Sequence, residues 1–213
     1  MAERKSLRQT LRLRRRALTP PQQRFAAAKL CRLLKHQPLF VRSRHVAFYL
    51  PNDGEIDPRP LMDAALACGK RCYLPVLKPG SENRLWFVRF DKHTQLHNNR
   101  FGIPEPRTDY RQTLTAEQLD LVLMPLVGFD AEGGRMGMGG GFYDRTFAFK
   151  HQLQHSKTYL LGLAHSCQRV EQLDVAAWDI PLNAIATEQN VLRGNQRLLE
   201  RDFIGSMLAG SKL

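Results

Sequence analysis

Cysteine is scarce in this sequence, and both long hydrophobic runs and a hydrophobic opening segment are missing. The four cysteines, Cys31, Cys68, Cys72 and Cys167, are scattered and form neither a CxxC pair nor a zinc-binding spacing. This distribution fits reduced thiols in a cytoplasmic protein best. No apolar run approaches the ~20 residues that a membrane-spanning helix needs, and no signal peptide is expected. We therefore expect a cytoplasmic protein that has no membrane partner.

Acidic residues are outnumbered, and the net charge is +12. The excess is concentrated before Phe25, where eight basic residues accompany a single acidic one, Glu3. Such a segment raises the local concentration of anions, which include nucleic acid, an acidic membrane and small polyanions such as ATP. A solvated basic face that aids solubility is an equally simple interpretation. Charge alone does not choose between them.

Familiar sets of catalytic side chains are also missing. The sequence presents no Ser-His-Asp or Cys-His set, and its seven histidines show no metal-binding spacing. A hydrophobic fraction of 43% over 213 residues is enough to bury a real core, and a charged fraction of 24% is average. We interpret residues 1–213 as one domain, with basic helices in 1–36 and a C-terminal tail of unassigned role in 192–213.

Hydrophobic spacing predicts two helices and then alternating strands and helices. The first helix is expected at 3–17, and the second runs to about Leu34, with Thr19 and Gln22 forming a capping box. Strands are predicted at 45–50, 71–77, 84–90, 120–125, 159–164 and 183–187, a helix at 57–67, and a polar loop at 93–115. This rhythm indicates an α/β sandwich with a mainly parallel sheet.

The strongest functional signal is a glycine-rich loop at 133–145, which reads GGRMGMGGGFYDR. It follows a predicted buried strand and precedes a predicted helix, where α/β folds bind ligands. Glycines let backbone N–H groups approach an anion, and the start of the helix would add positive potential. The loop lacks the Lys-Ser/Thr ending of a Walker A motif, and Phe142 stands where a dinucleotide-binding loop has its third glycine.

The charges that flank these glycines favour a phosphate cradle over a flexible glycine hinge. Arg135, Asp144 and Arg145 supply both signs of charge beside the loop. A carboxylate such as Asp144, placed just beyond a phosphate site, is suited to hold Mg²⁺ directly or through water. The loop therefore predicts a phosphate-binding site with a carboxylate beside it that is suited to hold Mg²⁺.

The segment 125–130, followed by Gly134-Arg135-x-Gly137-x-Gly139-x-Gly141-Phe142-Tyr143-Asp144, resembles the signature of 5-formyltetrahydrofolate cyclo-ligases. Residues 4–8, 49–55 and 101–106 match the same family, so the resemblance covers most of the chain. It implies a three-layer α/β/α sandwich. It also implies that ATP and 5-formyltetrahydrofolate become 5,10-methenyltetrahydrofolate, ADP and phosphate through a phosphorylated formyl group, an iminium phosphate.

The resemblance also implies roles for individual residues. ATP is expected to contact Arg4, Lys5, Arg8, Arg135, Met136, Gly137, Met138, Gly139, Gly140, Gly141, Phe142 and Tyr143. The folate is expected at Leu50, Glu55, Met138, Gly139, Gly140, Gly141 and Phe142, and Mg²⁺ at Asp144 and Asp179. Some relatives have a lysine where this chain has Gly140, so the positive charge must come from Arg135, Arg145 or the N-terminal segment, and Arg135 and Arg145 are the residues assigned to catalysis. A monomer with ATP and a reduced folate as its partners is expected.

Glu55 can also be interpreted without the resemblance. Residues 51–55 follow a predicted strand and so lie at its carboxyl end, where α/β folds place ligands. An ionised carboxylate there could accept hydrogen bonds from the N–H groups of a pterin edge. The alternative is a solvated loop carboxylate without a ligand. Tyr49, Phe142 and Tyr143 are candidates to stack on the pterin ring, or they belong to the core.

Two other functions are compatible with parts of the sequence. A nucleic-acid-binding protein would use the basic first helix on phosphates, and its affinity would fall steeply with salt. That hypothesis leaves the glycine loop and Asp144 unexplained, so no nucleic-acid partner is expected. A kinase acting on a small metabolite would share the glycine loop, and only its product would distinguish it.

Overall fold

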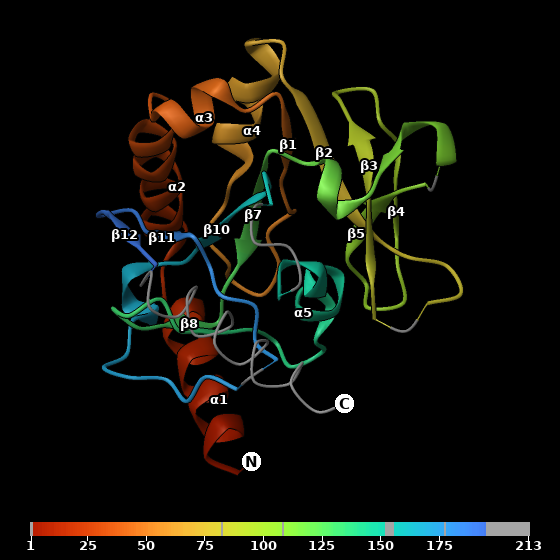
Figure 1. Ribbon diagram of the computed structural model, residues 1–213. Helices are drawn as coiled ribbons and strands as arrows, with labels where there is room; N and C mark the ends of the chain where they lie inside the picture. Colours follow the sequence, from red (N-terminus) through yellow and green to blue (C-terminus); the bar gives the residue numbers. More distant parts are fainter. Residues whose placement is uncertain (1, 82, 108, 152–155, 177, 195–213) are drawn as a thin grey trace.

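The computed structural model describes residues 2–81, 83–107, 109–151, 156–176 and 178–194 and confirms the predicted α/β class (Figure 1). Within these residues, the central sheet runs in the order β12 (Val191–Arg193), β11 (Ala184–Ala186), β10 (Tyr159–Leu163), β7 (Leu121–Pro125), β1 (His45–Ala47), β2 (Arg71–Leu77), β3 (Leu85–Phe90) and β6 (Thr113–Leu114). The strands from β11 to β2 are parallel, and antiparallel strands flank them on both sides. The central sheet is therefore mainly parallel.

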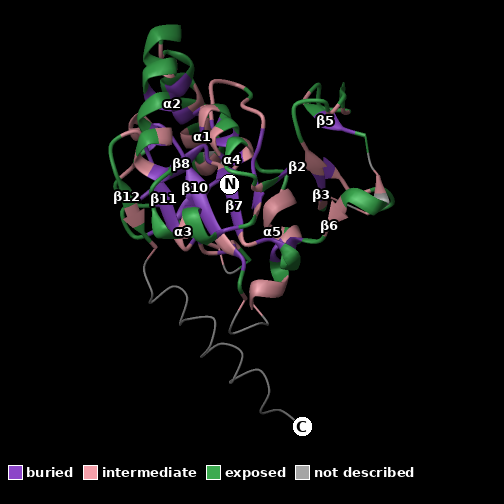
Figure 2. Cartoon of the chain, turned by 90° about the horizontal axis from the view of Figure 1, so that it is seen from above, coloured by how far each residue is buried: buried purple, intermediate pink, exposed green. Residues whose placement is uncertain are grey.

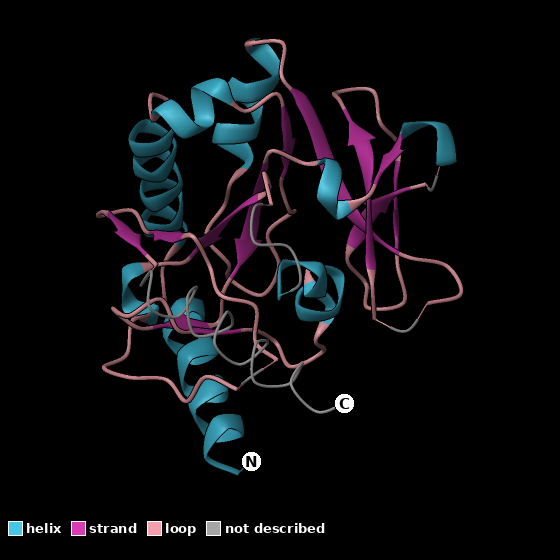
Figure 3. Cartoon of the chain, in the orientation of Figure 1, coloured by secondary structure: helices cyan, strands magenta, loops and turns pink. Residues whose placement is uncertain are grey.

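Helices cover one face of this sheet. They are α2 (Pro20–Leu34), α3 (Pro38–Arg42) and α4 (Arg59–Ala67), which gather on one side of β1 and β7 (Figure 3). The predicted capping box of α2 is confirmed, with Thr19 and Gln22 bonding each other's backbone. Leu30, Leu61 and Leu123 belong to the same buried cluster. Figure 2 shows this burial concentrated in the strands of the sheet.

Shorter elements cover the opposite face. Side chains alternate across a strand, so Leu121 and Leu123 of β7 face the helices, while Val122 and Met124 face a second cluster with Phe147. That cluster lies under α5 (Phe142–Thr146) and the 3₁₀ turns η2 (Ala116–Gln118) and η3 (Ala148–His151). The sandwich therefore has a thick helical layer and a thin one.

The first helix, α1 (Ala2–Arg16), lies apart from these layers, across loops that leave the carboxyl ends of the strands (Figure 1). Its Leu11 is fully buried with Val127, Met136 and Leu173, beside the hairpin β8 (Gly128–Phe129) and β9 (Arg135–Met136) and the turn η4 (Ser166–Gln168). Gly128 permits this approach, because a Cβ there would lie 2.4 Å from Cδ1 of Leu11. Hydrophobic packing thus holds a basic helix against the edge of the sheet where the parallel strands have their carboxyl ends.

Two local predictions were inaccurate. The first strand ends at Ala47 and not at residue 50. The predicted polar loop at 93–115 contains the hairpin β4 (Leu96–Asn98) and β5 (Pro104–Pro106), the turn η1 (Tyr110–Gln112) and the edge strand β6. Backbone pairing forms the hairpin, and the Asn99 side chain accepts hydrogen bonds from the N–H groups of Phe101 and Ile103 at its turn. Strand β4 is exposed, so no apolar alternation marked it in the sequence.

None of the described helices is long and apolar enough to cross a membrane. The predicted tail lies outside the described residues from position 195 onward, so its assignment stays a prediction.

Candidate functional site

Helix α1 brings basic side chains to the glycine loop. Arg8 donates a hydrogen bond from Nε to the Gly137 carbonyl oxygen at 2.8 Å, and its guanidinium lies beside Gly139. Arg4 lies 3.3 Å from the Asp179 carboxylate. Partial burial and the nearby Arg4 and Arg12 lower the pKa of Arg8, which forms no ion pair among the described residues. A crowded cation of this kind is favourable for binding an anionic ligand.

The glycine loop itself is anchored by two side chains. Asn83 donates to the Gly140 carbonyl oxygen from Nδ2 at 3.0 Å, and Arg145 donates to the same oxygen from Nη1 at 2.8 Å. Gly139 and Gly141 have φ values of 95° and 67°, which disfavour other residues. Because these contacts fix the loop, the geometry fits a shaped cradle better than a free hinge.

Gly140 is coupled to the aromatic side chain that follows it. A Cβ at Gly140 would come within 2.9 Å of the Phe142 ring, which in turn contacts Phe101 edge-on at a centroid distance of 5.7 Å. A lysine at this position would therefore require Phe142 to move. Met138 is half-exposed on the same loop.

Arg135 and Asp144 form the corner where the metal was predicted. The Arg135 guanidinium forms an ion pair with Asp144, and its Nε donates to the Ile180 carbonyl oxygen at 2.9 Å. The Ile180 N–H donates to the Asp144 carboxylate at 3.2 Å. Asp179 precedes Ile180 and accepts from the Ala176 N–H, so both predicted metal carboxylates belong to this corner.

This corner fits Mg²⁺ better than a protein-caged metal. The described residues contain no group of three or more His, Cys, Asp or Glu side chains that could hold a metal ion. Mg²⁺ is usually held by one or two carboxylates together with phosphates and water, so Asp144 and Asp179 are a sufficient donor set. In this structure Asp179 is paired with Arg4 and Asp144 with Arg135, so each arginine would have to share its carboxylate with a bound Mg²⁺ ion.

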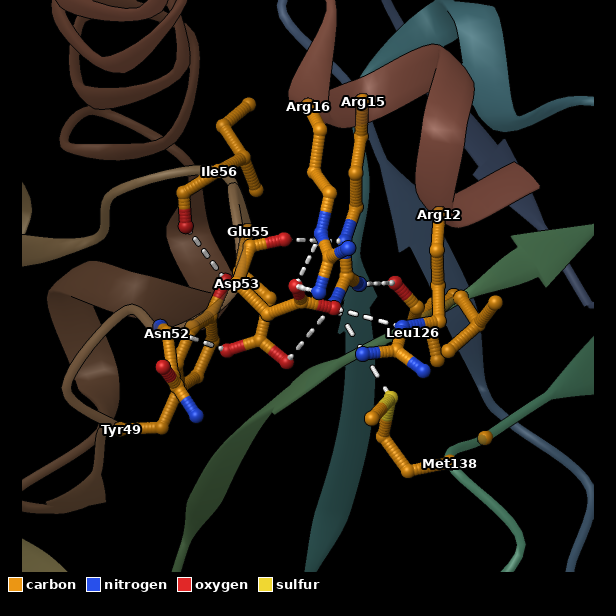
Figure 4. A network of polar contacts seen from close by, with 12 residues as sticks. Arg12, Arg15, Arg16, Tyr49, Asn52, Asp53, Glu55, Ile56, Leu126 and Met138 are labelled. Atoms are coloured by element: carbon orange, nitrogen blue, oxygen red, sulfur yellow. Dashed lines mark hydrogen bonds and ion pairs between the residues drawn. The ribbon is translucent and has the colours of Figure 1, made fainter. Parts of the chain in front are cut away.

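Glu55 lies in the loop that follows β1, with only 10% of its side chain exposed. The Asn52 N–H donates to its carboxylate at 3.1 Å, and the Arg15 guanidinium lies 3.7 Å away (Figure 4). Burial raises the pKa of Glu55 to about 7, and the positive charge of Arg15 opposes this rise. Together with burial, the negative charge of Glu55 raises the pKa values of Tyr49, which lies just after β1, and of Tyr143 in α5. These groups form a buried polar cluster beside the glycine loop, which Arg15 contacts at the sulfur of Met138.

Two predicted residues are placed less directly. Leu50 packs at the margin of the helix-side core, close in sequence to Glu55. Lys5 is exposed on α1, and no contact with the glycine loop is present among the described residues. The roles assigned to both in ligand binding stay predictions.

The sequence analysis missed the centre of the network in Figure 4, where three arginines surround Asp53. Arg12 donates to its carboxylate at 2.7 Å, Arg15 at 2.9 Å, and Arg16 pairs with it from the more exposed side. Burial alone would raise the pKa of Asp53, but the hydrogen bonds from the three arginines outweigh this effect and lower the pKa to about 2. Arg15 is not part of a solvated basic face, because its side chain has no exposed surface.

A signal for Arg15 was present in the spacing of α1. Positions 4, 8, 11 and 15 follow one another at intervals of four, three and four residues, which places them on one helix face. Since Leu11 on that face is buried, its neighbours had to be near the protein interior. Charge concealed the pattern, because arginines are normally assigned to the surface.

The elevated pKa of Glu55 predicts a stability change with a defined sign. The folded state retains a proton that the unfolded chain, with a pKa of 4.5, releases at lower pH. The contribution of protonated Glu55 to the stability of the folded state is therefore fully present below pH 4.5 and is lost as the pH rises through about 7. At about pH 8 we expect Glu55→Gln to unfold with a free energy roughly 1–3 kcal/mol above that of the wild type. Urea titrations should find no such gain at about pH 4, nor at either pH for the exposed control Glu117→Gln.

Comparisons with known proteins identify similar sequences and structures. Residues 1–188 match the model of the 5-formyltetrahydrofolate cyclo-ligase family. A 5-formyltetrahydrofolate cyclo-ligase of Escherichia coli (strain K12) is 45% identical over 181 residues, which are 85% of this chain and 98% of the relative. The NMR structure of an Aquifex aeolicus 5,10-methenyltetrahydrofolate synthetase matches with a TM-score of 0.76 and 34% identity, covering 89% of this chain and 92% of that one. A Mycoplasma pneumoniae 5,10-methenyltetrahydrofolate synthetase, at 23% identity and a TM-score of 0.68 over 87% and 99% of the two chains, shares the fold.

Proposed function

Because this chain belongs to the 5-formyltetrahydrofolate cyclo-ligase family, we propose that it uses ATP and Mg²⁺ to convert 5-formyltetrahydrofolate to 5,10-methenyltetrahydrofolate. ADP and phosphate are the other products. The observation that carries the proposal is the convergence of α1, the glycine loop and the Glu55 loop, since Arg8 contacts Gly137 while Arg15 contacts Asp53. We expect the enzyme to act as a monomer in the cytoplasm.

The proposed chemistry requires positioning and charge neutralisation rather than a protein nucleophile. The N5-formyl oxygen attacks the γ-phosphorus, the bond to ADP breaks, and an iminium phosphate forms. N10 then attacks the activated formyl carbon, its proton is released, and phosphate departs with the former formyl oxygen. The attacking oxygen carries no proton, so the first step needs no strong base. The absence of a Ser-His-Asp or Cys-His set in the sequence agrees with this scheme.

On the nucleotide side, the proposal uses cations and backbone N–H groups. Arg4, Lys5 and Arg8 would approach the phosphates from α1, and residues 135–143 would surround them. Arg145 and Arg135 would stabilise the charge that develops during transfer. Mg²⁺ would be held by Asp144 and Asp179 and would neutralise phosphate charge when bound.

On the folate side, the pterin would lie between the Glu55 loop and the glycine loop. Ionised Glu55 accepts pterin N–H groups, while Leu50, Phe142 and residues 138–141 supply the walls. At neutral pH, Glu55 is close to its midpoint, because its pKa is raised to about 7. Affinity for the folate should therefore increase as the pH rises past neutrality.

Glu55→Gln is expected to weaken binding of 5-formyltetrahydrofolate by about ten- to a hundredfold above neutral pH, because one charge-assisted hydrogen bond is lost. The side chain keeps its shape, so ATP affinity should stay almost unchanged. Calorimetric titrations with each ligand measure both effects. Equal folate affinity in the variant and the wild type would remove Glu55 from the substrate pocket.

The direct test is the appearance of the methenyl chromophore on mixing the protein, ATP, Mg²⁺ and 5-formyltetrahydrofolate. We expect one ADP and one phosphate for each methenyl group formed. ADP formation without the chromophore, with phosphate transferred to another metabolite, would instead support a kinase. Tight, salt-sensitive RNA binding without turnover would support the nucleic-acid alternative.

A further inference from the structure

Arg15 is a fully buried cation that the proposed chemistry leaves without a task. Its Nε donates to the Asp53 carbonyl oxygen at 2.8 Å, and its Nη1 donates to the Leu126 carbonyl oxygen at 3.1 Å. Its Nη2 lies 3.9 Å from the sulfur of Met138 in the glycine loop. One guanidinium from α1 therefore contacts the loop after β1, the loop after β7 and the glycine loop (Figure 4).

The same guanidinium is the cation that faces Glu55, at 3.7 Å. Of the other groups around this carboxyl, the Asn52 N–H favours ionisation through one hydrogen bond, Asp53 is negative and opposes it, and Tyr49 and Tyr143 are buried phenols. His165 lies near Arg15 and Gly54, and burial together with the charge of Arg15 lowers its pKa, so it adds no stable positive charge. Without the Arg15 charge, the Asn52 N–H would be left alone to stabilise ionised Glu55 against burial and a negative neighbour.

The charge of Asp53 does not depend on Arg15 alone. Arg12 and Arg16 also bind its carboxylate, and the Arg16 side chain is half-exposed on the outer side. The structure thus separates two tasks of the arginine cluster. Arg12 and Arg16 neutralise Asp53, whereas Arg15 reaches past it to Glu55, to the backbone of the loop after β7 and to the sulfur of Met138 in the glycine loop.

We propose that Arg15 is the positioning residue of the folate site, which holds Glu55 in its charged form against the glycine loop. The proposal rests on the proposed function, since Glu55 is the residue assigned to the pterin. Arg15 acts through Glu55 and needs no contact with ATP or folate. It is therefore expected to affect folate use in a pH-dependent manner and to leave ATP binding almost unaltered.

The test compares the pH dependence of kcat/KM for 5-formyltetrahydrofolate among the wild type, Arg15→Gln, Arg15→Lys and Arg16→Gln. In the wild type this parameter should fall as the pH drops through about 7. Losing a nearby positive charge raises a carboxyl pKa, so Arg15→Gln should move the midpoint about one pH unit higher. Near neutral pH its kcat/KM should then be about fivefold lower, approaching tenfold at more acidic pH, and should recover at alkaline pH.

The other variants separate charge from geometry. Arg15→Lys keeps the charge but loses the planar fork, so its midpoint should stay close to the wild type while its alkaline plateau falls. Arg16→Gln removes an arginine that binds Asp53 but not Glu55, and its midpoint should not move. In a Glu55→Gln background, Arg15→Lys should cause no further change in the pH profile.

A purely structural Arg15 would give a different result. Equal losses for ATP and folate at every pH, with an unchanged midpoint in both Arg15 variants, would overturn the proposal. If Arg15→Gln does not fold, the alkaline plateau of kcat/KM in Arg15→Lys and the pH profile of the Glu55→Gln, Arg15→Lys double variant still test the proposal. The Glu55 carboxyl can also be titrated directly by ¹³C NMR in the wild type and Arg15→Lys. Absence of methenyl product from the wild type would refute the proposed function alone, since the NMR titration does not require turnover.

Discussion

Asp144→Asn is expected to abolish methenyl formation while leaving the fold intact. Asp144 follows the glycine loop directly and faces the Ile180 N–H and Arg135, so an amide of equal size can occupy its place. Losing the charge should weaken the binding of Mg²⁺ at the phosphates. We expect kcat to fall by at least about a hundredfold, which corresponds to a loss of about 2.8 kcal/mol of transition-state stabilisation at about 1.4 kcal/mol for each factor of ten. Spectrophotometric assays at increasing Mg²⁺ measure this loss.

The matched control is Asp63→Asn, which removes an exposed carboxylate from α4 on the helical face of the sheet. It should retain full activity, and circular dichroism should show both variants folded. Calorimetry of ATP with and without Mg²⁺ adds a measurement that does not depend on turnover. Near-normal activity of Asp144→Asn at saturating Mg²⁺ would exclude this carboxylate from the mechanism.

Arg8→Ala is expected to raise the KM for ATP by about ten- to a hundredfold, the effect of losing one charge-assisted contact. Arg8 donates a hydrogen bond to the backbone of the glycine loop, and among the described residues it has no carboxylate partner. The KM for 5-formyltetrahydrofolate should change little. A point substitution is cleaner than deletion of the helix start, because Leu7 packs against the cluster around Leu11.

Arg14→Ala is the matched control, since Arg14 is exposed on the same helix. It should behave as the wild type with both substrates. If Arg8→Ala and Arg14→Ala each reduced activity equally, and added salt abolished the difference from the wild type, α1 would act only as a diffuse positive surface. Equal losses for ATP and folate in Arg8→Ala alone would indicate a packing role.

The parts of the fold that were predictable from the sequence are those with strong local signals. Thr19 and Gln22 marked the start of α2 because a capping box is satisfied within four residues. Residues 121–125 are an uninterrupted apolar run because both faces of β7 are covered. The hairpin of β4 and β5 lacked such a signal, since backbone pairing and the Asn99 turn stabilise it more than burial does.

The candidate site was predictable to the extent that its motif is contiguous. The glycine loop could be identified because its residues are neighbours in the sequence. The pairing of Arg135 with the Ile180 backbone spans 45 positions, and that of Arg15 with Leu126 spans 111, so no local pattern could reveal either. The raised pKa of Glu55 likewise depends on burial by segments distant in the sequence.

The placement of α1 has a consequence for the order of synthesis. This helix leaves the ribosome before its partners, which follow 38 residues later at Asp53, 129 later at Gly137 and 175 later at Asp179. At about 5–20 residues per second, the nascent helix waits on the order of ten seconds or more for the last of them. During most of that interval Arg4, Arg8 and Leu11 lack the partners that they contact in the folded protein. A segment made early is therefore late to reach its final contacts, and the site at the carboxyl ends of the strands is completed only after Asp179 has emerged.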